Sequence, residues 1–100
     1  MENFNEIING DKPVLVDFFA TWCGPCQAMA PIIESLGKSL QGQARLLKID
    51  IDKNKTVANQ YQIQSVPTFI IFKKGQILWR YSGVMDKSAL EQQIKQYYLL

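Results

Sequence analysis

Histidine is absent from this chain of 100 residues, and cysteine occurs only twice, as Cys23 and Cys26. A structural zinc site needs four ligands, and here only carboxylates could complete a set begun by two cysteines, so we expect no metal site. No apolar run approaches the roughly 18 residues of a membrane span, and the N-terminus lacks the basic-then-apolar layout of a signal peptide. We therefore expect a cytoplasmic protein that does not bind a membrane.

Clusters of charge are also missing. The formal net charge is +2, and the lysines and arginines are scattered, with no run longer than Lys73-Lys74. This distribution favours an ordinary solvated surface over nucleic-acid binding. Hydrophobic residues make up 47% of the chain and charged residues 20%, as is typical of globular proteins. We expect residues 1–100 to form a single domain around one core, and the protein to be a monomer.

The order of apolar patterns predicts an α/β fold. Residues 14–19 form a continuous apolar run interrupted by one acid, which is typical of a central parallel strand buried on both faces. Residues 25–40 repeat apolar side chains at spacings of three and four, which predicts an amphipathic helix with a kink at Pro31. Residues 44–51 predict a second strand, after which we expect Asp52 to cap a short helix.

The second half of the chain predicts an antiparallel hairpin. Residues 68–73 and 76–81 flank Lys74-Gly75, a spacing that is typical of a tight turn. The sheet is therefore expected to be mixed. Asp86 is expected to cap a final helix that packs back across the sheet.

Two explanations remain for the motif Cys23-Gly24-Pro25-Cys26 once zinc is set aside. A structural disulfide would close a very short loop, for which the chain-entropy model gives only about 2 kcal/mol of stabilisation. A redox dithiol needs two sulfurs close enough to exchange between thiol and disulfide, one of them held as a reactive thiolate. The spacing supplies both requirements and favours the redox dithiol.

Cys23 is the candidate nucleophile. At the N-terminus of the expected helix, unpaired N–H groups and the positive end of the dipole favour a thiolate, whereas Cys26 lies one turn deeper. We therefore expect Cys23 to be the exposed member of the pair. Pro25 suits the first helical turn because it has no N–H, and Gly24 lets another backbone approach the sulfur closely. Both residues also fit an ordinary helix start.

The segment from Val14 to Cys26, VLVDFFATWCGPC, resembles the active-site segment of the thioredoxin family. Val66-Pro67-Thr68 with the strand and turn that follow resembles a second segment of that family, and residues 48–52 are similar to its middle strand. The likeness covers almost the whole chain. It implies the thioredoxin fold, a central sheet flanked by helices. Too few residues precede the first helix, suggested by Phe4, Ile7 and Ile8, to supply the extra N-terminal strand of many relatives, so we expect four strands.

The resemblance implies dithiol–disulfide exchange with target proteins. The Cys23 thiolate would attack a target disulfide, and Cys26 would resolve the mixed disulfide so that the target leaves reduced. A thioredoxin reductase drawing on NADPH would then reduce the Cys23–Cys26 disulfide, and the chain itself would bind no cofactor. Two alternatives stay open: a thioredoxin-like oxidase or isomerase, and a non-catalytic binding subunit. The Gly-Pro dipeptide argues against the first, and the intact cysteines argue against the second as a sole role.

Asp17 is the third candidate catalytic residue. Burial in an apolar strand favours the protonated carboxyl, which makes Asp17 a candidate proton carrier near neutral pH. The resemblance implies that Asp17 lies beneath the dithiol and assists deprotonation of Cys26. It also implies that Lys48 is a nearby cation that tunes the acid.

The resemblance further implies a substrate-binding surface. Pro67 would be cis, facing the dithiol and leaving the backbone of Val66 free to pair with an extended substrate segment. Gly83 would line the same groove. Trp22 would complete the apolar contact surface, although a tryptophan beside a helix start serves about as often to cover the core.

Two residues depart from the family pattern. Gln27 stands where many thioredoxins have a lysine, so one cation near the thiolate is missing, and we expect a somewhat higher pKa for the nucleophile. Phe19 stands where a tryptophan is common. The likeness alone therefore does not predict how strongly reducing the pair is.

Overall fold

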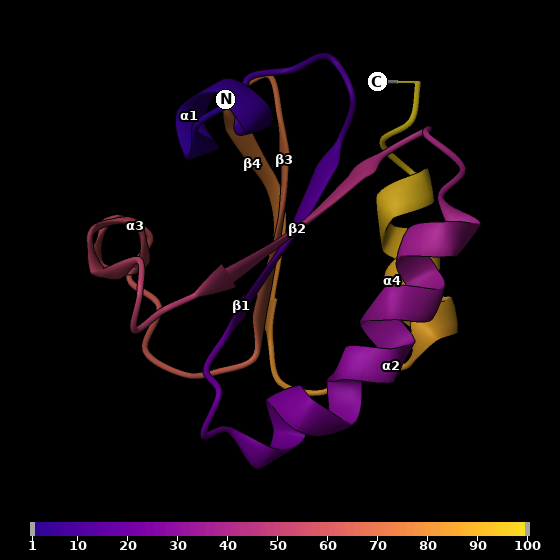
Figure 1. Cartoon of the computed structure of the whole chain (residues 1–100). Coiled ribbons are helices and arrows are strands. Elements are labelled where there is room, and N and C mark those ends of the chain that lie inside the picture. Colours follow the sequence, from indigo (N-terminus) through magenta and orange to yellow (C-terminus); the bar gives the residue numbers. More distant parts are fainter. Residues whose placement is uncertain (1, 100) are drawn as a thin grey trace.

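Four strands and four helices make up the fold in the computed structural model, which describes residues 2–99 (Figure 1). In chain order they are α1 (Phe4–Ile8), β1 (Val14–Phe19), α2 (Gly24–Ser39), β2 (Arg45–Asp50), α3 (Lys55–Gln60), β3 (Thr68–Lys73), β4 (Gln76–Ser82) and α4 (Lys87–Lys95). Every strand expected from the sequence is present, and the bounds differ from expectation by one residue at most.

The sheet is mixed, with the strand order β2-β1-β3-β4. β1 pairs in parallel with β2 and antiparallel with β3, and β3 pairs antiparallel with β4. Within residues 2–99 no strand covers the outer edge of β2, so the expected four-stranded sheet without an N-terminal strand is confirmed. The central strands β1 and β3 are almost wholly buried, in keeping with their continuous apolar runs.

Helices cover both faces of the sheet (Figure 1). One hydrophobic cluster lies between the sheet and helices α2 and α4, and another between the sheet and helices α1 and α3. The first cluster comprises Leu15, Met29, Ile33, Leu36, Leu40, Ala44, Phe69, Ile71, Leu90 and Ile94, and the second comprises Ile8, Val14, Val16, Phe18, Ile49, Ile70 and Phe72. Because side chains alternate along a strand, the odd-numbered residues of β1 face α2.

A short loop of four residues separates the end of β1 from the start of α2. Cys23 is the N-cap of α2, in an extended conformation (φ −88°, ψ 112°), and Pro25 lies in its first turn, where a missing N–H costs nothing. The helix continues through Pro31 as one element and buries one face against the sheet. The direct passage from β1 to α2 places the first cysteine at the end of the buried sheet.

The loop before α3 differs from expectation. Asp52 does not cap α3, because the N-cap is Asn54, which makes no side-chain capping bond. The N–H groups of Lys53 and Asn54 both donate to the carbonyl of Asp50, and this turn delays the start of the helix. The other two local predictions are confirmed: Lys74-Gly75 forms the hairpin turn with φ values of 53° and 80°, and Asp86 caps α4.

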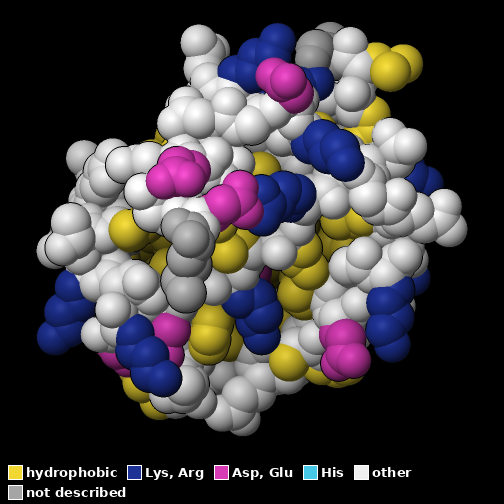
Figure 2. Space-filling model, turned by 45° about the horizontal axis from the view of Figure 1, so that its top comes forward, with side chains coloured by type: hydrophobic (Ala, Val, Ile, Leu, Met, Phe, Trp, Pro, Cys, Tyr) yellow, Lys and Arg dark blue, Asp and Glu magenta, His cyan; other side chains and the backbone are white. Residues whose placement is uncertain are grey.

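On one face of the molecule, charges of the two signs are mixed. Figure 2 shows positive and negative side chains interspersed with apolar ones over the face in view. Among the helices of residues 2–99, none has the length and apolar character needed to cross a membrane. The mixture of signs on this face agrees with the scattered charges of the sequence.

The N-cap of α4 gives a test of the local prediction. A carboxylate oxygen of Asp86 accepts the N–H of Ala89 at 2.7 Å, so Asp86→Ala is expected to lower the free energy of unfolding by about 1 kcal/mol in urea titrations. The matched control, Asp86→Asn, keeps an acceptor oxygen and should retain most of the stability. An equal loss in both variants would contradict the capping role.

Candidate active site

The two cysteines form a disulfide, with their Cα atoms 5.2 Å apart, a separation within the usual range for such a bond. The backbone N–H of Cys26 donates to the sulfur of Cys23 at 3.1 Å. In the dithiol form the same N–H, at the positive end of α2, stabilises a thiolate at Cys23. The N-cap position thus supports the expected choice of nucleophile.

The exposed fraction does not distinguish the two cysteines. Cys23 is 4% exposed and Cys26 is 8% exposed, so the expectation that Cys23 is the exposed member is wrong. Both pack in a small cluster with Ala20 and with the half-buried side chains of Phe19, Ile51 and Val66, which covers both sulfurs. The cysteines differ instead in the cavity that each one lines.

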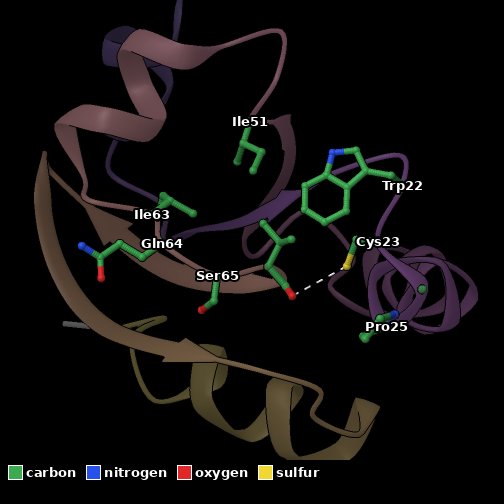
Figure 3. Close-up of a pocket in the computed structure, with 9 residues that line it drawn as sticks. Trp22, Cys23, Pro25, Ile51, Ile63, Gln64 and Ser65 are labelled. Atoms are coloured by element: carbon green, nitrogen blue, oxygen red, sulfur yellow. Dashed lines mark hydrogen bonds between the residues drawn. The ribbon is translucent and has the colours of Figure 1, made fainter.

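Cys23 lines a cleft of about 390 Å³. Its walls are formed by Trp22, Cys23, Gly24, Pro25, Ile51, Ile63, Gln64, Ser65 and Val66. Figure 3 shows Trp22 and Cys23 on one side of this cleft, with Ile63, Gln64 and Ser65 across from them. The sulfur of Cys23 lies 3.6 Å from the carbonyl oxygen of Val66, and in the dithiol form the Cys23 thiol can donate to that oxygen.

Trp22 is a wall of the cleft and does not cover the core. The residue is 68% exposed, and its indole N–H donates to a carboxylate oxygen of Asp52 at 2.8 Å. The hydrogen bond fixes one edge of a large apolar ring while its faces stay available for contact. The arrangement is suited to binding, the role that the resemblance implies for Trp22.

The Val66-Pro67 peptide bond is cis, as the resemblance implies. Gly83 donates its backbone N–H to the carbonyl of Pro67 at 2.9 Å and has a φ of 118°, a region that favours glycine. Neither Pro67 nor Gly83 lines the cleft of Cys23, but Val66 does. The proposed substrate-binding residues are therefore contiguous, with Val66 at the cleft and Pro67 and Gly83 beside it.

Gly24 lines the cleft of Cys23 and has open space around it. A Cβ atom added at Gly24 would meet no other atom within 4 Å. The amide nitrogen of Gln27 donates to the carbonyl of Thr21 at 2.8 Å, and Gln27 lines a cavity that Cys26 also lines. The position that departs from the family pattern thus supports the loop before α2 and brings no cation to the pair.

Asp17 is buried on the face of the sheet that α2 covers. It is 3% exposed, and its Oδ1 atom has no hydrogen-bond partner among residues 2–99. Burial raises the pKa of Asp17 to about 6, against a smaller lowering by the positive charge of Lys48. A carboxyl with that pKa can take up and release a proton near neutral pH.

Lys48 is a neighbour of Asp17 in the sheet and lines a cavity with Cys26. It is paired with Asp17 in the parallel register of β1 and β2, and its ammonium lies 4.7 Å from the ring centroid of Phe19. Lys48 and Cys26 line the same cavity, of about 220 Å³, which is separate from the cleft of Cys23. The cation is thus close to both groups that the resemblance joins in proton transfer.

Sequence reasoning missed several residues of the site. Asp52 orients Trp22, and Ile63, Gln64 and Ser65 form the wall across from Cys23. The hydroxyl of Thr68 donates to the carbonyl of Ser65 at 2.7 Å and is 2.8 Å from the hydroxyl of Ser82. No local pattern marks these residues, because Asp52 bonds to Trp22, Thr68 contacts Ser82, and residues 63–65 face Cys23, all from distant parts of the chain. Among residues 2–99, no cluster of three potential metal ligands occurs.

This fold with a disulfide-bonded pair at a helix N-terminus defines a dithiol–disulfide oxidoreductase. The family model described as Thioredoxin matches residues 1–96. A thioredoxin-like protein of Synechocystis sp. is 54% identical over 94 residues, which are 93% of this chain and 90% of that protein. Among solved structures, a mutant thioredoxin of Halobacterium salinarum is 36% identical with a TM-score of 0.85, over 96% of this chain and 83% of that one. The chain belongs to the thioredoxin family.

A further relative differs in length. Thioredoxin Y of rice, described as chloroplastic, is 47% identical over 93% of this chain, which covers 56% of the rice protein. This chain therefore spans about half the length of that relative. The shared part includes the whole sheet and both cysteines of this chain.

The raised pKa of Asp17 predicts a stability that depends on pH. Because the folded-state pKa of about 6 exceeds the usual value of 3.8, this carboxyl contributes stability below pH 4 that is lost as pH rises through 6. Between pH 4 and pH 7 the free energy of unfolding of the oxidised wild type should therefore fall by roughly 2 kcal/mol relative to that of Asp17→Asn. Urea unfolding at both pH values measures the difference.

The exposed Asp11 provides the control for this experiment. Asp11→Asn should leave the difference between pH 4 and pH 7 close to that of the wild type. If the difference in free energy of unfolding between the wild type and Asp17→Asn stayed constant with pH, the Asp17 carboxyl would titrate at its ordinary value.

Proposed function

We propose that this chain reduces disulfides in other proteins and is itself reduced by a thioredoxin reductase that draws on NADPH. The observation that carries the proposal is the position of Cys23. Its sulfur accepts the Cys26 N–H at the start of α2 and lines a mostly apolar cleft. A nucleophile with this support, beside a cleft open to another chain, suits exchange with disulfides of proteins.

In the first step an extended segment of the target lies along the cleft beside the backbone of Val66. The Cys23 thiolate attacks one sulfur of the target disulfide, the target S–S bond breaks, and the other target sulfur leaves as a thiolate that takes up a proton. A mixed disulfide now joins Cys23 to the target. The wide cleft and the absence of a side chain at Gly24 leave space for this covalent intermediate.

In the second step Cys26 releases the target. Ionised Asp17 accepts the proton of the Cys26 thiol, and the resulting thiolate attacks the sulfur of Cys23. The Cys23–Cys26 disulfide forms, the mixed disulfide breaks, and the target sulfur leaves as a thiolate that takes up a proton, so two electrons have passed to the target. Lys48, which lines the cavity of Cys26, favours the ionised groups during this transfer.

The oxidised chain then needs two electrons, which the reductase supplies from NADPH, and the chain itself binds no cofactor. We place the cycle in the cytoplasm, as the sequence predicts, with a monomeric chain as the carrier. The rice and Arabidopsis relatives named Thioredoxin Y are described as chloroplastic, and a plastid is the alternative location. Fractionation of the source cells with an antibody to this chain separates the two.

Coupled turnover tests the carrier role. With NADPH, a thioredoxin reductase and a disulfide-bonded protein such as insulin, the wild type should support continuous NADPH oxidation, and Cys23→Ser should support none, because the attacking sulfur is lost. Cys26→Ser should accumulate mixed disulfides through Cys23, visible as reductant-sensitive bands in gel electrophoresis. Absence of turnover by the wild type would falsify the carrier role with that reductase. Trapping mainly by Cys23→Ser would reverse the assigned roles of the cysteines.

The proton-transfer role of Asp17 makes a kinetic prediction. In rapid-mixing experiments the release step should accelerate as pH rises through the region of 6, because the ionised carboxyl is the base. Asp17→Asn should slow release at pH 7 by roughly 100-fold, the low end for general base catalysis, and should lose that inflection. An inflection that persisted in Asp17→Asn would assign the base to another group.

A further inference from the structure

The wall across the cleft from Cys23 is a loop that precedes β3. Ile63, Gln64, Ser65 and Val66 line the cleft, and none of them lies in a helix or strand. We call residues 63–66 the recognition loop. A loop that presents backbone to a substrate has to be held in place by contacts from the rigid elements around it.

Arg80, in the edge strand β4, contacts the two residues that precede this loop. It is paired with Ile70 in the antiparallel register of β3 and β4, so the two side chains lie on the same face of the sheet. Ile70 belongs to the hydrophobic cluster under α1 and α3, against which Tyr61 and Ile63 pack. The side chain of Arg80 therefore extends over the segment that joins α3 to the recognition loop.

The guanidinium of Arg80 binds two successive carbonyl groups of that segment. One nitrogen donates to the carbonyl of Tyr61 and another to the carbonyl of Gln62, the latter at 3.0 Å. Tyr61 is the C-cap of α3, so its carbonyl is one of those that the helix leaves unpaired at the negative end of its dipole. A planar, positively charged fork is suited to satisfying two such acceptors at once.

The backbone changes direction at this point. Gln62 has a φ of 52°, in the left-handed region, and Ile63 donates its N–H back to the carbonyl of Ala58 at 2.9 Å. A non-glycine residue in that region keeps its conformation only where its surroundings hold it. Arg80 supplies part of that support, immediately before the recognition loop begins.

The other end of the recognition loop is held from the same strand. Ser82, two residues after Arg80 and on the same face of β4, contacts the hydroxyl of Thr68, which donates to the carbonyl of Ser65. Strand β4 thus supports the loop at both ends. The contact at the Arg80 end carries a full positive charge and two hydrogen bonds.

We propose that Arg80 is a positioning residue that fixes the recognition loop for the capture of extended protein segments next to their disulfide. The proposal rests on the proposed function, because it specifies how protein targets are held beside Cys23. The positioning role of Arg80 should therefore affect two classes of disulfide substrate differently. A protein segment has to lie along the loop, whereas a small aromatic disulfide needs only access to the sulfur of Cys23.

The test compares Arg80→Met and Arg80→Lys with the wild type, each reduced chemically beforehand, so that no reductase is needed. Second-order rate constants are measured for reduction of insulin and of 5,5′-dithiobis(2-nitrobenzoate). Arg80→Met should lower the insulin rate constant about three- to tenfold, a modest factor because the hydrogen bonds are exposed, and should leave the small disulfide within about twofold of wild type. Arg80→Lys keeps the positive charge but loses the planar fork of donors, so its insulin rate constant should lie between those of the wild type and Arg80→Met.

The chain offers a matched control in its other arginine. Arg45 makes an ion pair with Glu2, and neither residue lines the cleft of Cys23. Arg45→Met should leave the ratio of the two rate constants unchanged. Amide hydrogen exchange provides a second readout, in which Arg80→Met should speed exchange at residues 63–66 more than in the sheet.

The outcomes separate the two proposals. A wild type that reduces the small disulfide but not insulin would overturn the proposed function, and the role of Arg80 with it. If the wild type reduces both, an unchanged ratio in Arg80→Met overturns the positioning role alone, as does an equal loss for both disulfides. If Arg80→Met fails to fold, the ratio in Arg80→Lys decides in the same way.

Discussion

The N–H of Cys26 donates to the sulfur of Cys23 across 3.1 Å, and the rest of the site depends on that contact. It exists because Cys23 is the N-cap of α2, so its side chain meets the unpaired donors of the first turn. The N-cap in turn has a fixed place because β1, which leads into α2, is held between β2 and β3 in the centre of the sheet. Burial of an apolar strand thus positions a polar, reactive sulfur at its end.

The disulfide separates two environments. On one side Cys23 lines an open cleft whose walls are mostly apolar, and on the other Cys26 shares a smaller cavity with Lys48. Asp17 lies on the α2 face of the sheet and is paired in register with Lys48. The space beside Cys26 is therefore separate from the cleft of Cys23, so in the proposed cycle a bound target segment leaves room for proton transfer from Cys26 to Asp17. The buried carboxyl destabilises the folded chain when it ionises, and its raised pKa is what suits it to that transfer.

The walls of the cleft depend on contacts between distant segments. The ring of Trp22 is oriented by Asp52, and the recognition loop is supported by β4 through Arg80 and through Thr68 with Ser82. These are polar contacts near the surface, so each contributes little to the stability of the fold. Their effect is to reduce the number of conformations in which the unbound cleft exists, which lowers the conformational entropy that the cleft itself would lose on binding a target.

Apolar periodicity, helix-start residues and turn residues determined the strands, the helices, the position of Cys23 at the N-terminus of α2 and the turn at Lys74-Gly75, because each of these features depends on interactions between residues a few positions apart. The same local reasoning was wrong about Asp52. It accepts a hydrogen bond from Trp22, 30 positions away, and does not cap α3. It was also wrong about the exposure of Cys23, since neighbours from other elements cover the sulfur. The sheet register and the packing of α2 and α3 on opposite faces decided the partner of Asp52 and the burial of Cys23. They also brought Arg80 to Tyr61, 19 positions away. Such contacts form only when separate elements are brought together, so no short stretch of sequence contains them.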